Sequence, residues 1–445
     1  MLLVPTETQL IDFVTSRRWF ASKTREVTHA KVLDRVSLHE GEPELNVELV
    51  EVGFDTGTHE TYQLLTSGAE LDALADPRHT RELVHMMRAG SMARGGEGIL
   101  EFRAVEGFAS LGTELTTARL ITSEQSNTSI VFDDELILKV FRRMEPGVNP
   151  ELEMLRFLTE RGFENIAQLG GWYAYIGQPL DATLGVLQQF VRGAVDGWEM
   201  ALDELEAEPE RFLTRLRRLG QVTGSMHAVL GSDASDPTFC SEDPSGESLA
   251  LLTATVDEEI SRIFVELPED IEALDPIRGR GEEVRESLAL LSHAGSFGKQ
   301  IRTHGDLHLG QTLWAPERDD WALIDFEGEP ARSLAERRRK RSPLRDVAGM
   351  LRSFAYAVSA VEILRGTVAP EGWEQRAREE FLKGYNETVD QSLMPAGDTA
   401  FQRLLTVFEL EKAVYELRYE LNNRPEWIHI PVAGILRMLE TAAAA

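Results

Sequence analysis

The sequence is most constrained by two short segments that read as strands, each of which runs directly into a series of polar residues. Residues 301–303 precede His304-Gly-Asp-Leu-His-Leu-Gly-Gln311, and residues 322–324 precede Asp325-Phe-Glu327. We expect each of these segments to form a short strand and each polar series to form the loop at its end. Loops on a rigid scaffold commonly carry catalytic residues. The two series therefore predict a site that contains two carboxylates and an amide.

The spacing of these polar residues is typical of phosphoryl transfer. This reaction asks for little covalent chemistry from the protein, but it needs oxygen ligands for the magnesium ions that neutralise the phosphates. Kinases supply His-x-Asp, an amide five positions after that Asp, and a second Asp that opens a D-F-G-like triplet. The residues at this spacing are His304, Asp306, Gln311 and Asp325. The alternative is that these loops are solvated turns or helix caps.

Each residue of this series has a predicted role. Asp306 accepts or orients the proton of the attacking hydroxyl, while Gln311 and Asp325 bind Mg²⁺ through oxygen atoms. His304 is placed on the substrate side and is expected to hold the loop by backbone hydrogen bonds. His308 is a weak zinc candidate, because no Cys or Glu-x-x-His partner accompanies it.

A nucleotide-binding lobe is expected upstream of this site. Residues 118–123, 129–132 and 135–141 read as strands, and residues 124–128 read as a polar turn between the first two. The turn lacks the glycines of a Gly-x-Gly-x-x-Gly loop, so phosphate contacts would depend on its hydroxyls, amides and backbone N–H groups. The residues predicted to make these contacts are Ser126, Asn127, Thr128 and Ser129. The alternative is an ordinary hairpin.

Lys139 lies within an apolar strand, where an unpaired ammonium would be costly to bury. Kinases pair such a lysine with the α- and β-phosphates and with a Glu on the following helix. Asn149 and Pro150 predict the start of that helix. We predict Glu153 as the partner, with Glu151 as its competitor. The alternative for Lys139 is an edge-strand position with its ammonium in water.

The apolar segment 184–191 predicts a buried strand that leads into a hinge between lobes. In a kinase the adenine edge meets main-chain groups at such a link. We predict that the backbone from Gln189 to Val191 makes these contacts. An ordinary exit from a strand into a loop is the alternative.

Five motifs resemble those of bacterial maltokinases, and the resemblance covers essentially the whole chain. They are Arg17-Arg-Trp-Phe-Ala21, Gln125-Ser-Asn-Thr-Ser129, the His304 series, Ser342-Pro-Leu-Arg-Asp-Val-Ala-Gly-Met350, and Tyr415-Glu-Leu-Arg-Tyr-Glu420 with Asn423-Arg-Pro-Glu-Trp427. The resemblance implies that the protein uses ATP and Mg²⁺ to phosphorylate maltose at its anomeric hydroxyl, giving maltose 1-phosphate for α-glucan synthesis. Glucosamine kinases and other sugar kinases resemble the same pattern, so the acceptor stays open.

Two functional hypotheses from different classes follow. The first is the sugar kinase. The second is a catalytically silent nucleotide- or sugar-binding module whose partner is trehalose synthase, a trehalose-to-maltose converting enzyme that the resemblance brings in. Intact Lys139, Asp306, Gln311 and Asp325 favour turnover.

The acceptor residues are expected on the helical segment 401–420 and just after it. Its Glu residues recur near helical spacing, and carboxylates with an aromatic face suit a sugar. Together with the resemblance, this pattern predicts Glu416, Glu420 and Trp427 as substrate-side residues, and Asp346 joins them. The alternatives are a solvated Glu face and, for Asp346, a cap of the helix 347–354.

The order of elements predicts an α+β fold. A short helix (7–14) and strands (45–54 and 61–65) occupy the first part, strands predominate up to residue 190, and helices follow. The resemblance implies a bilobal protein-kinase-like fold with an additional N-terminal α/β cap subdomain. The predicted domains are the cap at 1–95, the nucleotide-binding lobe at 96–190 and the mostly helical catalytic lobe at 191–445.

Charge limits the kinds of partner. The 445 residues include 75 acidic and 46 basic side chains, so the net charge is -29, which opposes binding to nucleic acids. The basic run Arg337-Arg-Arg-Lys-Arg341 is predicted to be a solvated loop, with steering of anionic ATP as the alternative.

The remaining features predict a cytoplasmic protein. The single cysteine, Cys240, fits a reducing compartment. The first residues lack a basic region with an apolar core, and no run is expected to approach the roughly 20 residues of a membrane span. The resemblance implies a small-molecule sugar as the ligand, and charge and hydropathy predict no contact to membranes or nucleic acids.

Overall fold

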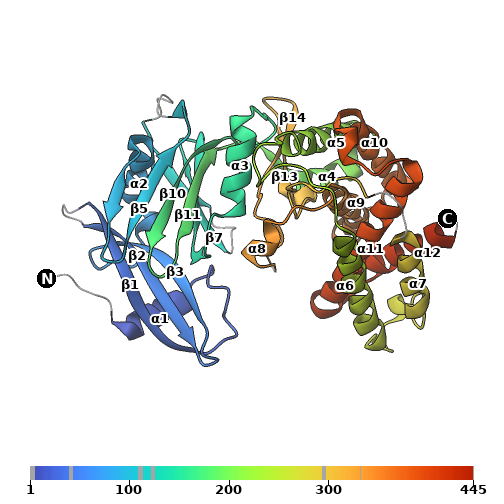
Figure 1. Ribbon diagram of the computed structural model, residues 1–445, viewed down its shortest axis with the longest axis horizontal. Coiled ribbons are helices and arrows are strands. Elements are labelled where there is room, and N and C mark those ends of the chain that lie inside the picture. The colour runs from blue at the N-terminus through green and yellow to red at the C-terminus, as the bar shows by residue number, and fades with distance from the viewer. Residues whose placement is uncertain are drawn as a thin grey trace. The chain divides into compact units, whose positions relative to one another are not determined.

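The computed structural model describes residues 6–39, 44–108, 114–121, 126–292, 297–330 and 332–443. The chain separates into two compact units. The first unit comprises Met1–Glu160 and Ile166–Arg192, and the second comprises Arg161–Asn165 and Gly193–Ala445. Figure 1 shows strands concentrated in the first unit and helices in the second. This distribution confirms the predicted α+β class.

The N-terminal part of the first unit is a helix packed on an antiparallel sheet. Helix α1 (Glu7–Ser16) starts with a capping box in which Thr6 and Gln9 exchange hydrogen bonds. The sheet has the order β1-β2-β3-β9. Its strands are β1 (Val27–His39), β2 (Leu45–Phe54), β3 (His59–Ser67) and β9 (Arg143–Met144). Apolar residues of α1 and the strands share one buried cluster with Trp19 and Phe20.

The rest of the first unit is a larger antiparallel sheet with the order β4-β5-β10-β11-β8-β7-β6. Its strands are β4 (Met92–Arg94), β5 (Gly98–Ala104), β6 (Ala118–Ile121), β7 (Asn127–Phe132), β8 (Leu136–Phe141), β10 (Leu169–Gly177) and β11 (Ala182–Gln189). Helices α2 (Pro77–Ala89) and α3 (Pro150–Glu160) and the 3₁₀ helix η1 (Ala73–Ala75) accompany it. The predicted boundary at residue 95 falls between β4 and β5, which pair with each other. The predicted domain limits stay a prediction.

The second unit is mostly helical. Its helices are α4 (Gly197–Ala207), α5 (Pro209–Leu230), α6 (Gly246–Val265), α7 (Gly281–Ser292), α8 (Leu334–Arg337), α9 (Leu344–Arg365), α10 (Trp373–Thr388), α11 (Asp398–Asn423) and α12 (His429–Ala443), with 3₁₀ helices η3 (Glu272–Leu274), η4 (Leu309–Gln311), η5 (Gln391–Leu393) and η6 (Pro425–Trp427). Helices α5 and α10 cross closely at two glycines. A Cβ on Gly220 would lie 2.0 Å from the oxygen of Phe381, and one on Gly384 would lie 1.9 Å from the oxygen of Arg217.

A small sheet carries the second predicted polar series. It has the order β12-β13-β14, with β12 at Val195–Asp196, β13 at Thr312–Ala315 and β14 at Asp320–Leu323. Strand β14 ends two residues before Asp325, close to the predicted strand at 322–324. The strand predicted at 301–303 is wrong, because only Ile301 forms an isolated bridge, to Arg341. In the described part of the chain, no strand pairs with these three residues along their length.

Helix α9 is a core helix with the composition of a membrane span. Its 22 residues are long and apolar enough to cross a bilayer, so the expectation that no run approaches such a length is wrong. However, 67% of its most apolar window is buried inside the fold. A mostly buried helix of a soluble domain passes the same test, so α9 does not support a membrane contact.

Candidate active site

The first unit contains an ion pair between Lys139 and a glutamate of α3. The Lys139 ammonium on β8 lies 2.9 Å from Glu151, and both side chains are largely buried. Gln188 of β11 donates a hydrogen bond of 3.3 Å to the same carboxylate. The predicted anionic partner of Lys139 is therefore present, and it comes from the predicted helix.

The choice of Glu153 as that partner was wrong. Asn149 accepts a 2.8 Å hydrogen bond from the backbone N–H of Glu151, so α3 starts where Asn149 and Pro150 predicted. Residues two positions apart on an α-helix are separated by about 200° around the helix axis. Glu151 is buried whereas Glu153 is half-buried, so the helix turns Glu151 rather than Glu153 toward β8.

The predicted phosphate turn is only partly described. Residues 122–125 lie outside the described part of the chain, Ser126 is an exposed bend, and Asn127 to Ser129 already belong to β7. Ser129 is directly opposite Lys139 in the sheet, so these two side chains share a face. Thr128 lies on the other face, where its hydroxyl accepts a 2.7 Å hydrogen bond from Arg142. The phosphate role predicted for Thr128 is therefore wrong, while those of Ser126, Asn127 and Ser129 stay predictions.

The predicted adenine link is partly engaged by the protein itself. The backbone N–H of Gln189 donates to the oxygen of Gln168 at 2.8 Å, and that of Phe190 donates to the oxygen of Glu135 at 2.7 Å. The N–H of Gln189 cannot also bind an adenine, which corrects the prediction for this group. The contact predicted for Val191 stays a prediction.

In the second unit, His304 ties the two polar series together. Its Nε2 lies 2.9 Å from the backbone oxygen of Ile324, and its ring packs on Phe326 with 4.7 Å between ring centroids. The predicted role in holding the loop is confirmed. The placement of His304 on the substrate side is wrong, because the side chain is completely buried.

Asp346 holds the backbone of the same loop from the first turn of α9. One carboxylate oxygen accepts the N–H of His304 at 2.7 Å, and the other accepts the N–H of Gly305 at 2.9 Å. His227 of α5 approaches the first oxygen at 3.1 Å. Burial opposes ionisation of Asp346, but the hydrogen bond and charge of His227 prevail and lower the pKa of the carboxyl.

These contacts correct both predictions for Asp346. The residue is buried, so it neither faces a substrate nor caps α9, whose N-cap is Pro343. It fixes the backbone of His304 and Gly305 instead. His227 was missed because its role depends on the packing of α5. The only available signal was a histidine on the apolar face of the periodic helix.

Gln311 and Asp325 lie in direct contact. The side-chain amide of Gln311 donates to Asp325 at 3.1 Å, and the backbone oxygen of Gln311 accepts the N–H of Ile324 at 3.1 Å. Asp325 has a left-handed backbone (φ 63°), which turns the chain sharply after β14. A carboxylate and an amide oxygen are the hard ligands that Mg²⁺ prefers. The donor set therefore fits the predicted Mg²⁺.

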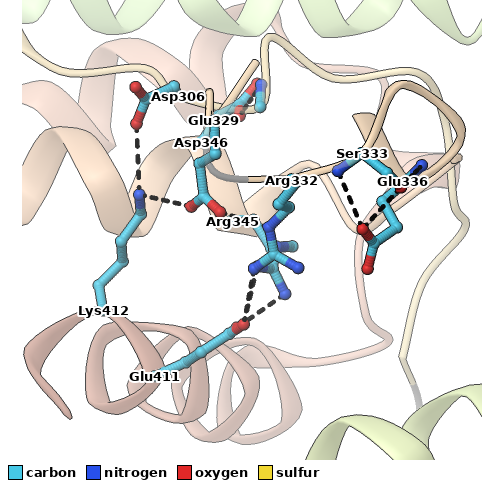
Figure 2. Close-up of polar contacts among 10 residues, drawn as sticks. Asp306, Glu329, Arg332, Ser333, Glu336, Arg345, Asp346, Glu411 and Lys412 are labelled. Carbon is cyan, nitrogen blue, oxygen red and sulfur yellow. Dashed lines mark hydrogen bonds and ion pairs between the residues drawn. The ribbon is translucent and has the colours of Figure 1, made fainter. Parts of the chain in front are cut away.

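Asp306 is held from a distant helix. The Lys412 ammonium of α11 lies 3.4 Å from Asp306 and 2.9 Å from Glu329 (Figure 2). Asp306 still exposes 25% of its side chain. Burial opposes the charge of Lys412, but the charges of Glu329 and Asp306 prevail and raise the pKa of the ammonium. Burial also opposes ionisation of Glu329, but the charges of Lys412 and Arg332 prevail and lower the pKa of this carboxyl to about 2.

Sequence reasoning missed Lys412 and Glu329. The available signal was that Lys412 is the single lysine of a helix rich in glutamates. Nothing in the local pattern connected it with Asp306, which lies 106 residues earlier.

The other predicted substrate-side residues belong to a buried cluster of α9, α11 and η6. Glu416 accepts hydrogen bonds of 3.0 and 2.6 Å from Arg352, and burial raises the pKa of its carboxyl against the opposing charge of Arg352. Glu420 accepts from Tyr356 at 3.0 Å, and Trp427 stacks on the ring of Tyr356. The alternative of a solvated Glu face is therefore wrong for these positions.

The three residues differ in how much of the side chain is exposed to solvent. Glu420 is 1% exposed and Trp427 is 5% exposed, so neither presents a surface to a sugar and both predictions are corrected. Glu416 exposes 15% of its side chain and stays a candidate. The physical reason is that Arg352, Tyr356 and Arg424 cover the carboxylates and the indole.

Two family models match the chain. The model described as "Maltokinase N-terminal cap domain" matches residues 13–92. The model described as "Phosphotransferase enzyme family" matches residues 117–381. These matches agree with the predicted resemblance and with a cap that precedes a kinase-like core.

Curated relatives and solved structures extend this similarity. The chain is 26% identical to a glucosamine kinase of Streptacidiphilus jiangxiensis, over 73% of this chain and 74% of the relative. It is also 26% identical to a glucosamine kinase of Mycolicibacterium smegmatis, over 72% of this chain and 79% of the relative. A structure of glucosamine kinase matches with a TM-score of 0.73 and 21% identity, over 97% of this chain and 99% of that one. At this identity the structural match establishes the fold.

Proposed function

The chain belongs to the phosphotransferase enzyme family, and from this premise we propose that it is an ATP-dependent sugar kinase. The observation that carries the proposal is the catalytic loop of the second unit. Asp346 and His304 fix its backbone, Asp306 remains accessible, and Gln311 contacts Asp325.

Asp306 is the proposed general base. Its carboxylate accepts the proton of the attacking sugar hydroxyl, and Lys412 orients it for this task. Such groups typically contribute about 10²–10⁴-fold to the rate. The buried His304 keeps the loop in place through Ile324, so Asp306 does not need to be ordered anew when a sugar binds.

The proposed nucleotide ligands follow the kinase pattern. Lys139, ordered by Glu151, binds the α- and β-phosphates, and Gln311 and Asp325 hold Mg²⁺. Mg²⁺ supplies neutralisation of the phosphate charge when it is bound. Ser129 shares a face of the sheet with Lys139. Among the residues predicted to contact the phosphates, it is therefore the first that we propose as a phosphate ligand.

The proposed acceptor is maltose, which would give maltose 1-phosphate. The match to a maltokinase cap domain supports this choice. The second candidate is glucosamine, because both curated relatives described above are glucosamine kinases. An interaction with trehalose synthase is proposed only on the family resemblance.

A coupled ADP-release assay tests the proposal with maltose, glucosamine, glucose and an aminoglycoside as acceptors. We expect Mg²⁺-dependent ADP release that is fastest with maltose. A clear preference for glucosamine would transfer the proposal to that sugar. No ADP release with any acceptor would reject the kinase and leave the hypothesis of a binding module. Calorimetry would then measure the affinity of the protein for trehalose synthase.

A further inference from the structure

A cavity of about 310 Å³ lies beside the basic run 337–341 in the second unit. Ligand pockets usually have about 300–1,000 Å³, so this volume suits a small molecule. Its charged lining consists of Arg332, Glu336, Arg339, Lys340, Arg341, Arg345 and Glu411, while Leu404 and Phe408 provide apolar surface. The run is not the solvated loop that was predicted, because Lys340 exposes only 8% of its side chain and pairs with Glu242.

Two of the four arginines that line the cavity, Arg332 and Arg345, already have carboxylate partners within it or beside it. Arg345 lies 2.7 Å from Glu411, and Arg332 pairs with Glu411 at 3.7 Å and with Glu329. Figure 2 shows this series of ion pairs, which continues through Lys412 to Asp306. Three cations and three anions alternate along it, so its charges balance.

Arg341 lines the cavity but lies outside this series of ion pairs, and it is half-buried whereas Arg339 is exposed. Its backbone is fixed by hydrogen bonds of 2.9 and 2.8 Å with Ile301. Within the described ranges, its half-buried guanidinium has no hydrogen bond and no carboxylate within 4.0 Å. Burial and the charges of Arg345 and Arg332 lower the pKa of Arg341 to about 10. The side chain is still cationic at neutral pH, at a cost that an anion would relieve.

We propose that this cavity binds a phosphomonoester, such as a sugar phosphate, with Arg341 as the anchoring residue. A guanidinium donates two parallel hydrogen bonds to a phosphate, which suits Arg341. A dianion can be shared with Arg332 and Arg345, whereas a single carboxylate would be satisfied by one arginine. Leu404 and Phe408 would pack against the ester group.

This site lies outside the catalytic constellation but is connected with it. Arg332 shares Glu329 with Lys412, and Lys412 holds Asp306. A phosphate that draws on Arg332 therefore acts on the same ion pairs that orient the proposed base. The proposal does not depend on which sugar the active site phosphorylates.

Titration calorimetry on the full chain tests this inference without requiring turnover. Glucose 1-phosphate, inorganic phosphate and glucose are titrated in phosphate-free buffer with saturating Mg²⁺ and ADP. We expect saturable binding of glucose 1-phosphate, weakened at least about tenfold in Arg341→Gln, which corresponds to the loss of one charge-assisted hydrogen bond. The matched control, Arg338→Gln, removes the same charge from the same run and should bind normally.

Several results would overturn the proposal. They are no saturation, equal binding of glucose, or equal losses in the Arg338 and Arg341 variants. Binding of inorganic phosphate as tight as that of glucose 1-phosphate would assign the cavity to free phosphate and reject the ester. If Arg341→Gln does not fold, Arg341→Lys keeps the charge without the two parallel donors, and unchanged affinity in that variant would also reject the anchoring role.

Discussion

Lys412 and Asp346 act on different parts of the same catalytic loop. Lys412 contacts the carboxylate of Asp306, whereas Asp346 accepts hydrogen bonds from the backbone N–H groups of His304 and Gly305. Asp306, the proposed base, is therefore oriented through its side chain, and the loop is fixed through its main chain. One residue orients the proposed base and the other fixes the geometry of the loop. Single substitutions can therefore test the two effects separately.

Replacement of Asp306 tests the proposed base. Asp306→Asn keeps the size of the side chain but cannot accept the proton. We expect turnover to fall at least about a hundredfold, within the range for acid–base groups, and ATP affinity to stay nearly unchanged. Steady-state kinetics with the exposed Asp398→Asn as control would measure both. Near-normal turnover in Asp306→Asn would remove it from catalysis.

A matched pair of substitutions tests the partner of Lys139. Glu151→Gln leaves the ammonium without its carboxylate, so we expect kcat/KM for ATP to fall at least about tenfold. Glu153→Gln, two residues along the same helix, should behave like the wild type. The opposite ranking of the two variants would restore Glu153 as the partner.

At the scale of elements, the first turn of α9 determines the shape of the catalytic loop. The carboxylate of Asp346 accepts two consecutive backbone N–H groups, those of His304 and Gly305, directly after the segment 301–303 that forms no strand. Helix α5 supports this carboxylate through His227, whose Nδ1 lies 3.0 Å from the hydroxyl of Tyr385 on α10. Three helices thus contribute to one loop conformation.

Asp346→Asn tests this arrangement. The new amide group would direct N–H donors at a backbone N–H, so one buried hydrogen bond becomes a repulsive contact. We expect the free energy of unfolding to fall by about 1–3 kcal/mol, together with a marked loss of turnover. Urea unfolding and the ADP assay would measure these effects. A variant with normal stability and activity would show that the loop does not depend on Asp346.

The crossing of α5 and α10 offers a second test at this scale. Gly220→Ala places a methyl group 2.0 Å from the oxygen of Phe381, and we expect a loss of about 1–3 kcal/mol in the free energy of unfolding. Gly246→Ala is the control, because no atom lies within 4 Å of its added Cβ. Equal stability of both variants, measured by thermal unfolding, would mean that the helices can separate without cost.

The whole molecule has a strong negative charge, which the many local ion pairs do not remove. A net charge of -29 at 445 residues implies self-repulsion in the compact state. The basic run is one exception, and its Arg341 remains without an anion among the residues that are described. The acidic surface therefore contrasts with a small cationic cavity.

Salt should consequently stabilise the protein. Raising NaCl from low salt to about 0.15 M shortens the Debye length to about 8 Å and screens the repulsion. We expect the Tm to increase over this range, and differential scanning calorimetry in phosphate-free buffer would measure it. A decrease of the Tm would mean that attractive ion pairs outweigh the net repulsion.

The sequence by itself determined the elements and the local motifs. Asn149 and Pro150 marked the start of α3, and the apolar strand around Lys139 required an anionic partner. The spacing of Asp306, Gln311 and Asp325 predicted a site in which Gln311 and Asp325 are indeed in contact. These features could be predicted because hydrophobic periodicity, capping and motif spacing are carried by residues that are close in the chain.

Only the tertiary structure decided which side chains complete the site. The rotation of α3 against β8 selected Glu151 over Glu153, and the packing of α9 turned Asp346 onto the loop backbone. Glu420 and Trp427 were covered by residues of α9 and by Arg424, while Lys412 reached Asp306 across 106 positions. Each outcome depends on contacts between segments that are distant in sequence, and burial and charge pairing at such contacts cannot be read from local spacing.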